Sequence, residues 1–376
     1  MRLVTTGFER ALNDAPSLTD ISTDCTLVRV QEGRTEDTYC MKASSTLATR
    51  VRIVAMNKML LPGDLDATLY LKTVIQPEYI PLQAYDSILV TVRRPVIIAA
   101  LVNGPNLICA IGITVDEVTF DKKLCVVTAG GYYGHTGSTI AATGRTILSG
   151  TDWNVIQAKV TPGTGNASIT VRLNDRNEIQ YTGFTYSTAS HFAIGVVSTA
   201  NTNEFTIIRH DDVAVNDTSG EYQNGWPGSG RVAWMTPNDI SAVYNWSSPT
   251  SSNLRTCLLD SSTSTYVIAT QPVAYLTFRD WTDVNGSGFD DNVYSINLVQ
   301  PHAQAKRSQM YLFAQPENLQ LCSAYSGGAY GEGIELDVAY PSSLVPLDVM
   351  YVNPATQLPW SRQMVNDVIG FGVKED

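Results

Sequence analysis

One loop of the chain has the spacing of oxygen ligands that calcium requires. Residues 283–291 read DVNGSGFDD, and their oxygen-bearing side chains fit positions 1, 3, 5 and 9 of a twelve-residue calcium loop. These side chains are Asp283, Asn285, Ser287 and Asp291. Position 12, where a bidentate glutamate is expected, holds Tyr294. The loop therefore predicts a weak calcium site, with an ordinary polar hairpin loop as the alternative.

A pair of adjacent carboxylates is the obvious candidate for glycoside hydrolysis, which uses two such groups on either side of the scissile bond. Asp211 and Asp212 stand at the end of a run that reads as a strand, EFTIIRHDDVAV. Neighbouring strand residues point to opposite faces, so the two carboxylates are not expected to flank one bond. We expect them to cap turns instead.

A glycine-rich segment carries the third candidate site. Residues 130–138 read GGYYGHTGS and contain Tyr132, Tyr133 and His135. Exposed aromatic rings on a loop can stack on sugar faces. The same segment also suits a contact with another subunit, which we favour, or a flexible connection.

Local signatures of catalysis are missing from the sequence. There is no H-E-x-x-H, G-x-S-x-G, Walker or G-x-G-x-x-G motif, and the four histidines are scattered. The six cysteines show no C-x-x-C or zinc spacing, which predicts buried free thiols. We therefore expect no cofactor and no enzymatic activity.

The elements that would position these residues read mostly as strands. In ASITVRLND, residues 167–175, apolar and polar side chains alternate with a period of two, which indicates a strand with one wet face. Similar runs occur at 49–56 and 332–340, separated by turn sequences such as LPGD and TPGTGN. The pattern predicts antiparallel β-sandwiches and few helices.

The last residues add one short helix. Ser361 is a suitable N-cap residue, and the apolar residues that follow it recur at helical spacing. Gly370 is suited to end the helix. The sequence FGVK then predicts a final strand, and Trp360 is expected to wedge the helix against a sheet.

Charge divides the chain into two parts. Residues 1–210 hold 18 basic and 18 acidic side chains, and residues 211–376 hold 7 basic and 18 acidic ones, which together give the net charge of −11. We expect domains at 1–215 and 231–376, with a linker at 216–230. The acidic part argues against nucleic acid. The longest apolar run, 96–102, is too short for membrane insertion.

Several segments, in order along the chain, resemble a family of bacteriophage virion proteins. The closing segment MYVNPATQLPWSRQMVNDVIGFGVKE is similar to the end of that family, with Gln357 in place of its usual glycine. TTGFE (5–9), GRTEDTYCMK (33–42) and DDVAVNDTSG (211–220) resemble further landmarks, as do GSGRVAWMTPN (228–238), YNWSSPTSSN (244–253) and STSTYV (262–267). Residues 57–150 carry little of the likeness.

The resemblance implies an all-β chain: a concanavalin-like, laminin-G-type jelly roll followed by a second β-sandwich domain. It also implies a structural part of a tail, fibre or capsid surface, located in the virion after assembly in the host cytoplasm. Its partners would be other virion proteins and copies of itself, in a homotrimer or ring, with host surface glycan as a further partner. A carbohydrate-binding host-recognition module and a glycan-degrading enzyme are the alternatives.

Overall fold

The protein is described here by a computed structural model of the whole chain. Its first part is described at residues 1–8, 17–21, 25–34, 38–45, 52–80, 85–87, 90–93, 95–116, 118–128, 140–199 and 206–232. The later part is described at residues 236–250, 253–259, 267–269, 274–282, 295–299, 302–305, 319–324, 330–331, 335–336, 343–346, 351–352, 358–361, 365 and 371–375. The chain divides into two compact units, Met1–Val232 and Ala233–Asp376.

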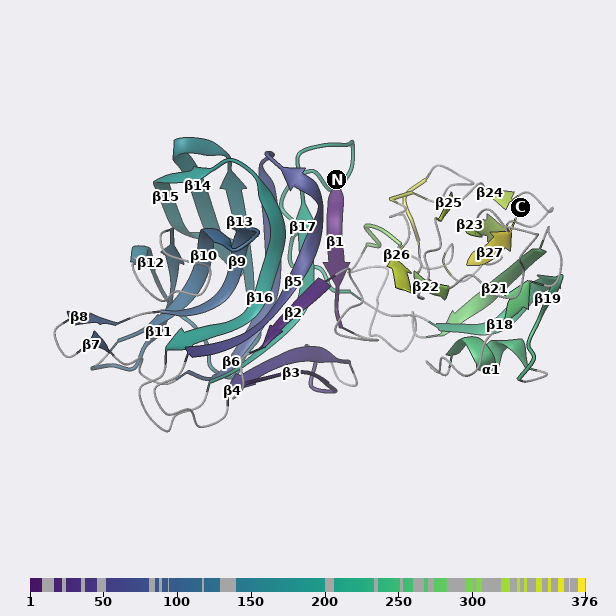
Figure 1. Cartoon of the computed structure of the whole chain (residues 1–376), viewed down its shortest axis with the longest axis horizontal. Coiled ribbons are helices and arrows are strands. Elements are labelled where there is room, and N and C mark those ends of the chain that lie inside the picture. The colour runs from purple at the N-terminus through teal and green to yellow at the C-terminus, as the bar shows by residue number, and fades with distance from the viewer. Residues whose placement is uncertain are drawn as a thin grey trace. The chain divides into compact units, whose positions relative to one another are not determined.

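The first unit is a sandwich of two antiparallel sheets (Figure 1). Sheet A has, in spatial order, β15 (Arg176–Tyr186), β14 (Gly163–Leu173), β13 (Asn154–Thr161), β6 (Leu69–Tyr79), β17 (Ile207–Asn216), β4 (Cys40–Ser45) and β3 (Cys25–Val30), and β1 (Arg2–Thr6) also pairs with β17. Sheet B has β12 (Ile140–Ile147), β11 (Lys122–Val127), β10 (Asn106–Val115), β9 (Val96–Asn103), β16 (Ala189–Thr199), β5 (Arg52–Leu65) and β2 (Ser17–Ile21). A hairpin of β7 (Tyr85–Ser87) and β8 (Val90–Arg93) stands apart.

The core between the sheets follows from strand alternation. In β14, the predicted apolar set is buried: Ala167, Ile169, Val171 and Leu173. The inward side chains of sheet B, such as Phe192 and Ile194, belong to the same cluster. Because burial of apolar surface dominates the folding free energy, this shared core joins the two sheets into one unit.

Sheet B also buries apolar side chains that belong to a second cluster. Val54 and Met56 of β5 alternate with residues of the main core, and Ile97, Ala100 and Val102 of β9 join them. Both faces of this sheet are therefore apolar. This explains why the sequence of β9 reads as an unbroken apolar run.

The second unit contains a six-stranded antiparallel sheet. Its strands are β18 (Thr236–Tyr244), β21 (Ala274–Thr282), β27 (Phe371–Glu375), β23 (Leu319–Ala324), β24 (Tyr330–Gly331) and β25 (Glu335–Leu336). Two further pairs are β19 (Trp246–Ser247) with β20 (Ile268–Ala269) and β22 (His302–Ala305) with β26 (Ser343–Pro346). The predicted final strand is β27, which lies between β21 and β23.

The helix described in full is not at the predicted place. It is α1, Leu254–Leu259, which begins after Asn253, whose Oδ1 accepts the Thr256 N–H at 3.3 Å. Near the end of the chain, Val365 is helical and its N–H donates to Ser361 O at 3.0 Å, as the predicted helix requires. Trp360 is buried, and the rest of the predicted helix lies outside the described residues. Within the described part of the chain, we find no helix with the length and apolarity of a membrane span.

Candidate functional site

Two predicted sites lie outside the described residues. They are the calcium loop with Asp283, Asn285, Ser287 and Asp291, and the aromatic segment with Tyr132, Tyr133 and His135. Among the residues that the structure describes, no group of three or more His, Cys, Asp or Glu side chains could hold a metal ion.

The expectation that Asp211 and Asp212 point to opposite faces is wrong. The pairing of β17 with β6 shifts register after Asp211, and Asp212 has a φ of 47°. This bulge turns both carboxylates toward Arg34, because Asp211 Oδ2 accepts its backbone N–H and Asp212 Oδ2 its guanidinium, each at 2.9 Å.

As expected, the carboxylates of Asp211 and Asp212 nevertheless accept hydrogen bonds from backbone N–H groups. Asp211 Oδ1 accepts the N–H of Asp212 at 2.7 Å, and Asp212 Oδ1 accepts the N–H of Val232 at 2.7 Å. Both carboxylates are buried, at 3% and 2% exposure. Their oxygens are occupied by fixed donors of the chain, which is the arrangement of a structural cap.

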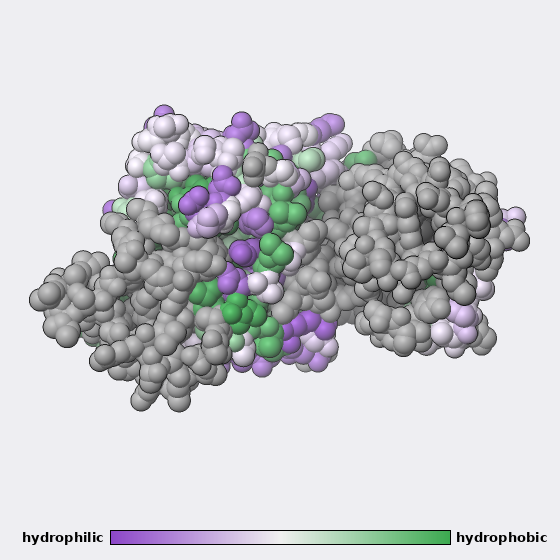
Figure 2. Space-filling view, viewed as in Figure 1, coloured by the Kyte–Doolittle hydropathy of each residue, from purple (hydrophilic) through white to green (hydrophobic). Residues whose placement is uncertain are grey.

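The outer face of sheet A carries polar rows that cross several strands. On β13, Ile156, Ala158 and Val160 enter the core, so Gln157 and Lys159 face outward. Cross-strand pairing places outward-facing residues of the adjacent strands next to Gln157 and Lys159. On the face of the first unit that Figure 2 shows, hydrophobic and hydrophilic surface lie side by side.

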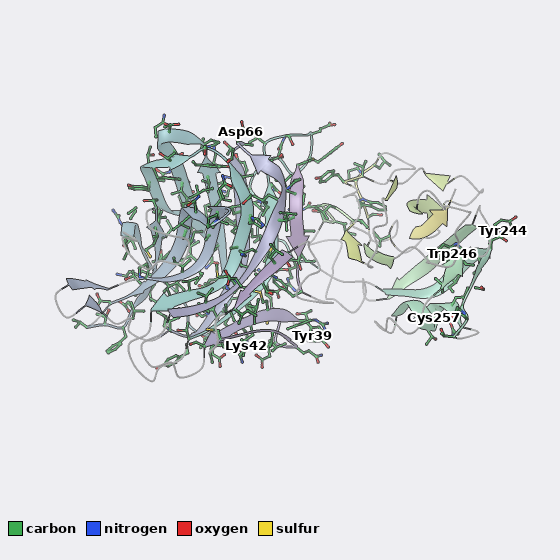
Figure 3. All side chains as sticks on the ribbon, viewed as in Figure 1. Tyr39, Lys42, Asp66, Tyr244, Trp246 and Cys257 are labelled. Carbon is green, nitrogen blue, oxygen red and sulfur yellow. The ribbon has the colours of Figure 1, made fainter. Side chains whose placement is uncertain are left out.

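The first of these rows is called the open row, in which Val28 is exposed and the three polar residues are half-buried. Cross-strand pairing places its members side by side on β3, β4, β17 and β6: Val28, Lys42, Arg209 and Gln76. Figure 3 labels Lys42 on the strand β4. Sheet A thus presents one apolar and three polar side chains in line.

Two glutamates fix the open row in place. Arg209 donates to Glu32 Oε2 at 2.7 Å and lies 2.8 Å from Glu78 Oε2. Lys42 lies 3.8 and 3.9 Å from the same two carboxylates, and Arg209 also donates to Gln76 Oε1 at 3.2 Å. The hydrogen bond from Arg209 lowers the pKa of the Glu32 carboxyl.

Two further rows lie further along the strands, beyond the row of Val155, Val74 and Asp211, and are called the covered rows. One consists of Arg172, Gln157 and Lys72, and the other of Thr170, Lys159, Tyr70 and Asn216. Residues 217–230, named the strap, lie across them. The contacts come from Trp226, whose ring centroid is 3.9 Å from Arg172 Cζ and 5.4 Å from the Tyr70 ring. The segment expected to be a linker therefore packs on the first unit.

Main-chain and amide groups of the strap complete this contact. Gly228 N–H donates to Gln157 Oε1 at 2.9 Å, and Asn216 Nδ2 donates to Gly225 O at 2.7 Å. Lys72 donates to Gly230 O, and Lys72 is 4% exposed. Burial lowers the pKa of Lys72 to about 8, while nearby Asp212 raises it. A buried lysine with a depressed pKa is a functional-site signal that the sequence pattern of β6 did not reveal.

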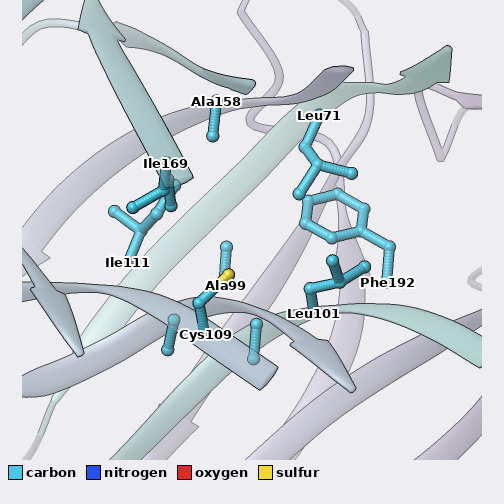
Figure 4. Close-up of a pocket in the computed structure, with 10 residues that line it drawn as sticks. Leu71, Ala99, Leu101, Cys109, Ile111, Ala158, Ile169 and Phe192 are labelled. Carbon is cyan, nitrogen blue, oxygen red and sulfur yellow. The ribbon is translucent and has the colours of Figure 1, made fainter. Parts of the chain in front are cut away.

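The cavity in Figure 4 is not a second site. It lies in the main core and is lined by apolar side chains, including Leu71, Ile111, Ile169 and Phe192. Its volume of about 10 Å³ is no more than one water requires, and an apolar void of this kind stays empty.

Comparison with known proteins gave solved structures alone, because no protein-family model and no curated protein matches the chain. An endo-β-1,4-glucuronan lyase from the fungus Trichoderma reesei has a TM-score of 0.44 and 14% identity, covering 58% of this chain and 96% of its own. The cellulose-induced protein Cip1 gives 0.41 and 10%, covering 60% and 100%. The alginate lyase Aly36B gives 0.35 and 6%, covering 58% and 98%.

These findings correct part of the interpretation of the sequence. The nearly all-β, concanavalin-like jelly-roll class is confirmed. The expectation of a phage structural protein without catalysis is overturned, because several of the similar structures are polysaccharide lyases. The resemblance to a virion family, the virion location and the expected partners stay predictions.

Proposed function

We propose that the first unit binds polysaccharide across the outer face of sheet A. The observation that carries this proposal is the open row, in which Lys42, Arg209 and Gln76 stand side by side on three neighbouring strands. Neighbouring strands lie about 4.8 Å apart, close to the repeat of an extended sugar chain. One polar side chain can therefore meet each successive sugar unit.

The chemistry of these side chains suits sugar hydroxyls. The ammonium group of Lys42 and the exposed carboxylates of Glu32 and Glu78, which Arg209 holds in place, offer hydrogen-bond donors and acceptors to these hydroxyls. Val28, 42% exposed at the end of the row, offers apolar surface to the C–H face of a sugar.

The glutamates make this surface ready for binding. Glu32 and Glu78 hold Arg209 and Lys42 in place before any ligand arrives. Binding then loses less side-chain entropy, since ordering a free arginine or lysine costs about 0.5–1.5 kcal/mol.

The test is calorimetry on the whole chain with a panel of neutral and carboxylated polysaccharides. We expect Arg209→Ala and Gln76→Ala to weaken binding about tenfold each, as loss of a hydrogen bond to a charged or polar partner predicts. The control is Arg145→Ala, which removes an exposed cation from sheet B.

Two results would contradict the proposal. The wild type could bind no member of the panel, or Arg209→Ala and Arg145→Ala could bind equally well. After each titration, the release of oligosaccharide from the polysaccharide is also measured, so that catalytic turnover is tested together with binding.

A further inference from the structure

The strap occupies the donors of the covered rows with neutral acceptors. Lys72 donates to Gly230 O, Asn216 to Gly225 O, and Arg2 to Gln223 Oε1 at 2.9 Å. The donors Lys72 and Arg2 carry positive charge, and a carboxylate acceptor adds a Coulomb attraction to them that a carbonyl or amide oxygen does not supply. A carboxylated ligand would therefore bind these donors more strongly than the strap does.

The covered rows also hold cations that pair with rings instead of carboxylates. Arg172 faces the Trp226 ring, and Lys159 lies 5.7 Å from the Tyr70 ring centroid. Among the described residues, neither cation forms an ion pair with a carboxylate. Lys72 is buried and lies near the Asp212 carboxylate, so Arg172 and Lys159 carry the positive charge of the covered rows that the strap does not pair with a carboxylate.

We propose that the covered rows are a second binding stretch for a carboxylated polysaccharide, and that the strap is a cover which such a ligand displaces. This inference rests on the proposed function, because the covered rows continue the face that the open row begins. A chain bound at the open row would run obliquely across the row of Val155, Val74 and Asp211 to reach the covered rows on β6, β13 and β14 once the strap leaves.

The attachment of the strap allows displacement without unfolding of the sandwich. Besides the contacts described above, the amine of Met1 pairs with Asp217 and Arg34 donates to Ser229 O at 3.2 Å, both near the ends of the strap. Its Ser219, Glu221, Tyr222 and Asn224 are exposed. On one side it continues from β17, and on the other the Val232 N–H is held by Asp212. Both anchors can remain while Trp226 moves away from Arg172.

The first test compares ligand lengths on the full chain. Trp226→Ala removes the ring that holds the strap on the covered rows, so the strap is displaced in a larger fraction of molecules. The apparent Kd is inversely proportional to this fraction and therefore falls. We expect affinity for long polyuronate oligomers to rise about fivefold or more, while affinity for uronate disaccharides stays unchanged. Lys159→Ala added to Trp226→Ala should abolish the gain. The matched control is Asn224→Ala, whose amide donates to Gly220 O within the strap.

The second test uses the wild type and needs no variant to fold. Long polyuronate should increase hydrogen exchange in residues 223–230 while it protects β6 and β13, whereas a strap that only stabilises the fold would show no gain in exchange.

If polyuronate binds but neither Trp226→Ala nor ligand changes the strap, this inference is wrong and the proposed function stands. If no glycan of the panel binds the wild type or Trp226→Ala, both are wrong.

Discussion

His210 lies between the two sheets with both ring nitrogens in hydrogen bonds. Nδ1 is 3.0 Å from Thr73 Oγ1, and Nε2 is 3.0 Å from Gly195 O. The ring is fully buried, so the charged form would lose its hydration. Burial lowers the pKa of His210 to about 4, which indicates a neutral structural histidine.

The pH dependence of stability follows from this shift. The unfolded chain takes up a proton near the ordinary pKa of 6.5, whereas the folded chain resists protonation until about 4. The free energy of unfolding should therefore fall by about 3 kcal/mol as pH drops from 6.5 to 4. Urea titrations at both pH values should show this loss in the wild type and not in His210→Gln. Equal losses in the two proteins would contradict the prediction.

At the scale of elements, close approach of strands depends on Gly195. This glycine lies on β16 opposite Met56 of β5, with a φ of 140°. A Cβ there would lie 2.0 Å from the carbonyl oxygen of Ala55. Because that atom belongs to the backbone of a paired strand, the sheet itself would have to shift.

We therefore expect Gly195→Ala to lower the free energy of unfolding by about 3 kcal/mol. Gly104→Ala is the matched control, since Gly104 also has a positive φ, of 54°, but nothing within 4 Å of an added Cβ. It should cost about 1 kcal/mol. Thermal or urea unfolding of the two variants measures the difference, and similar costs would show that the contact with Ala55 is not limiting.

Strands with one solvent-exposed face could be predicted from the sequence, whereas strands that are buried on both faces could not. β14 alternates because Arg172 and Thr170 face outward while Val171 enters the core. The bulge at Asp212 leaves no local pattern, since it depends on pairing with β6. The covered rows escaped prediction for the same reason: their residues are far apart in the chain, and only the register brings them together.

At the scale of the whole molecule, the main core lies within one of the two units. The main core of the first unit draws on residues from Val4 to Val215, all within Met1–Val232. Its last described contact is the Val232 N–H to Asp212. The first unit therefore contains what its fold requires.

A fragment of residues 1–232 should fold alone and unfold in one cooperative step, because it retains the whole core. A fragment of residues 1–210 should not fold, since it lacks the part of β17 that pairs with β1. Circular dichroism during heating distinguishes the two. A 1–232 fragment that aggregates or melts without a transition would show that the second unit is needed.

The position of β27 in its sheet has a consequence for synthesis on the ribosome. The first unit has all its strands once Asn216 has emerged, so it can fold while the remaining residues are still being translated. The second unit differs, because Phe371–Glu375 pair with both β21 and β23 and join the two halves of its sheet. Until these residues leave the exit tunnel, β21 and β23 each expose an unpaired edge. The nascent second unit is therefore open to wrong strand pairing until Phe371–Glu375 have emerged.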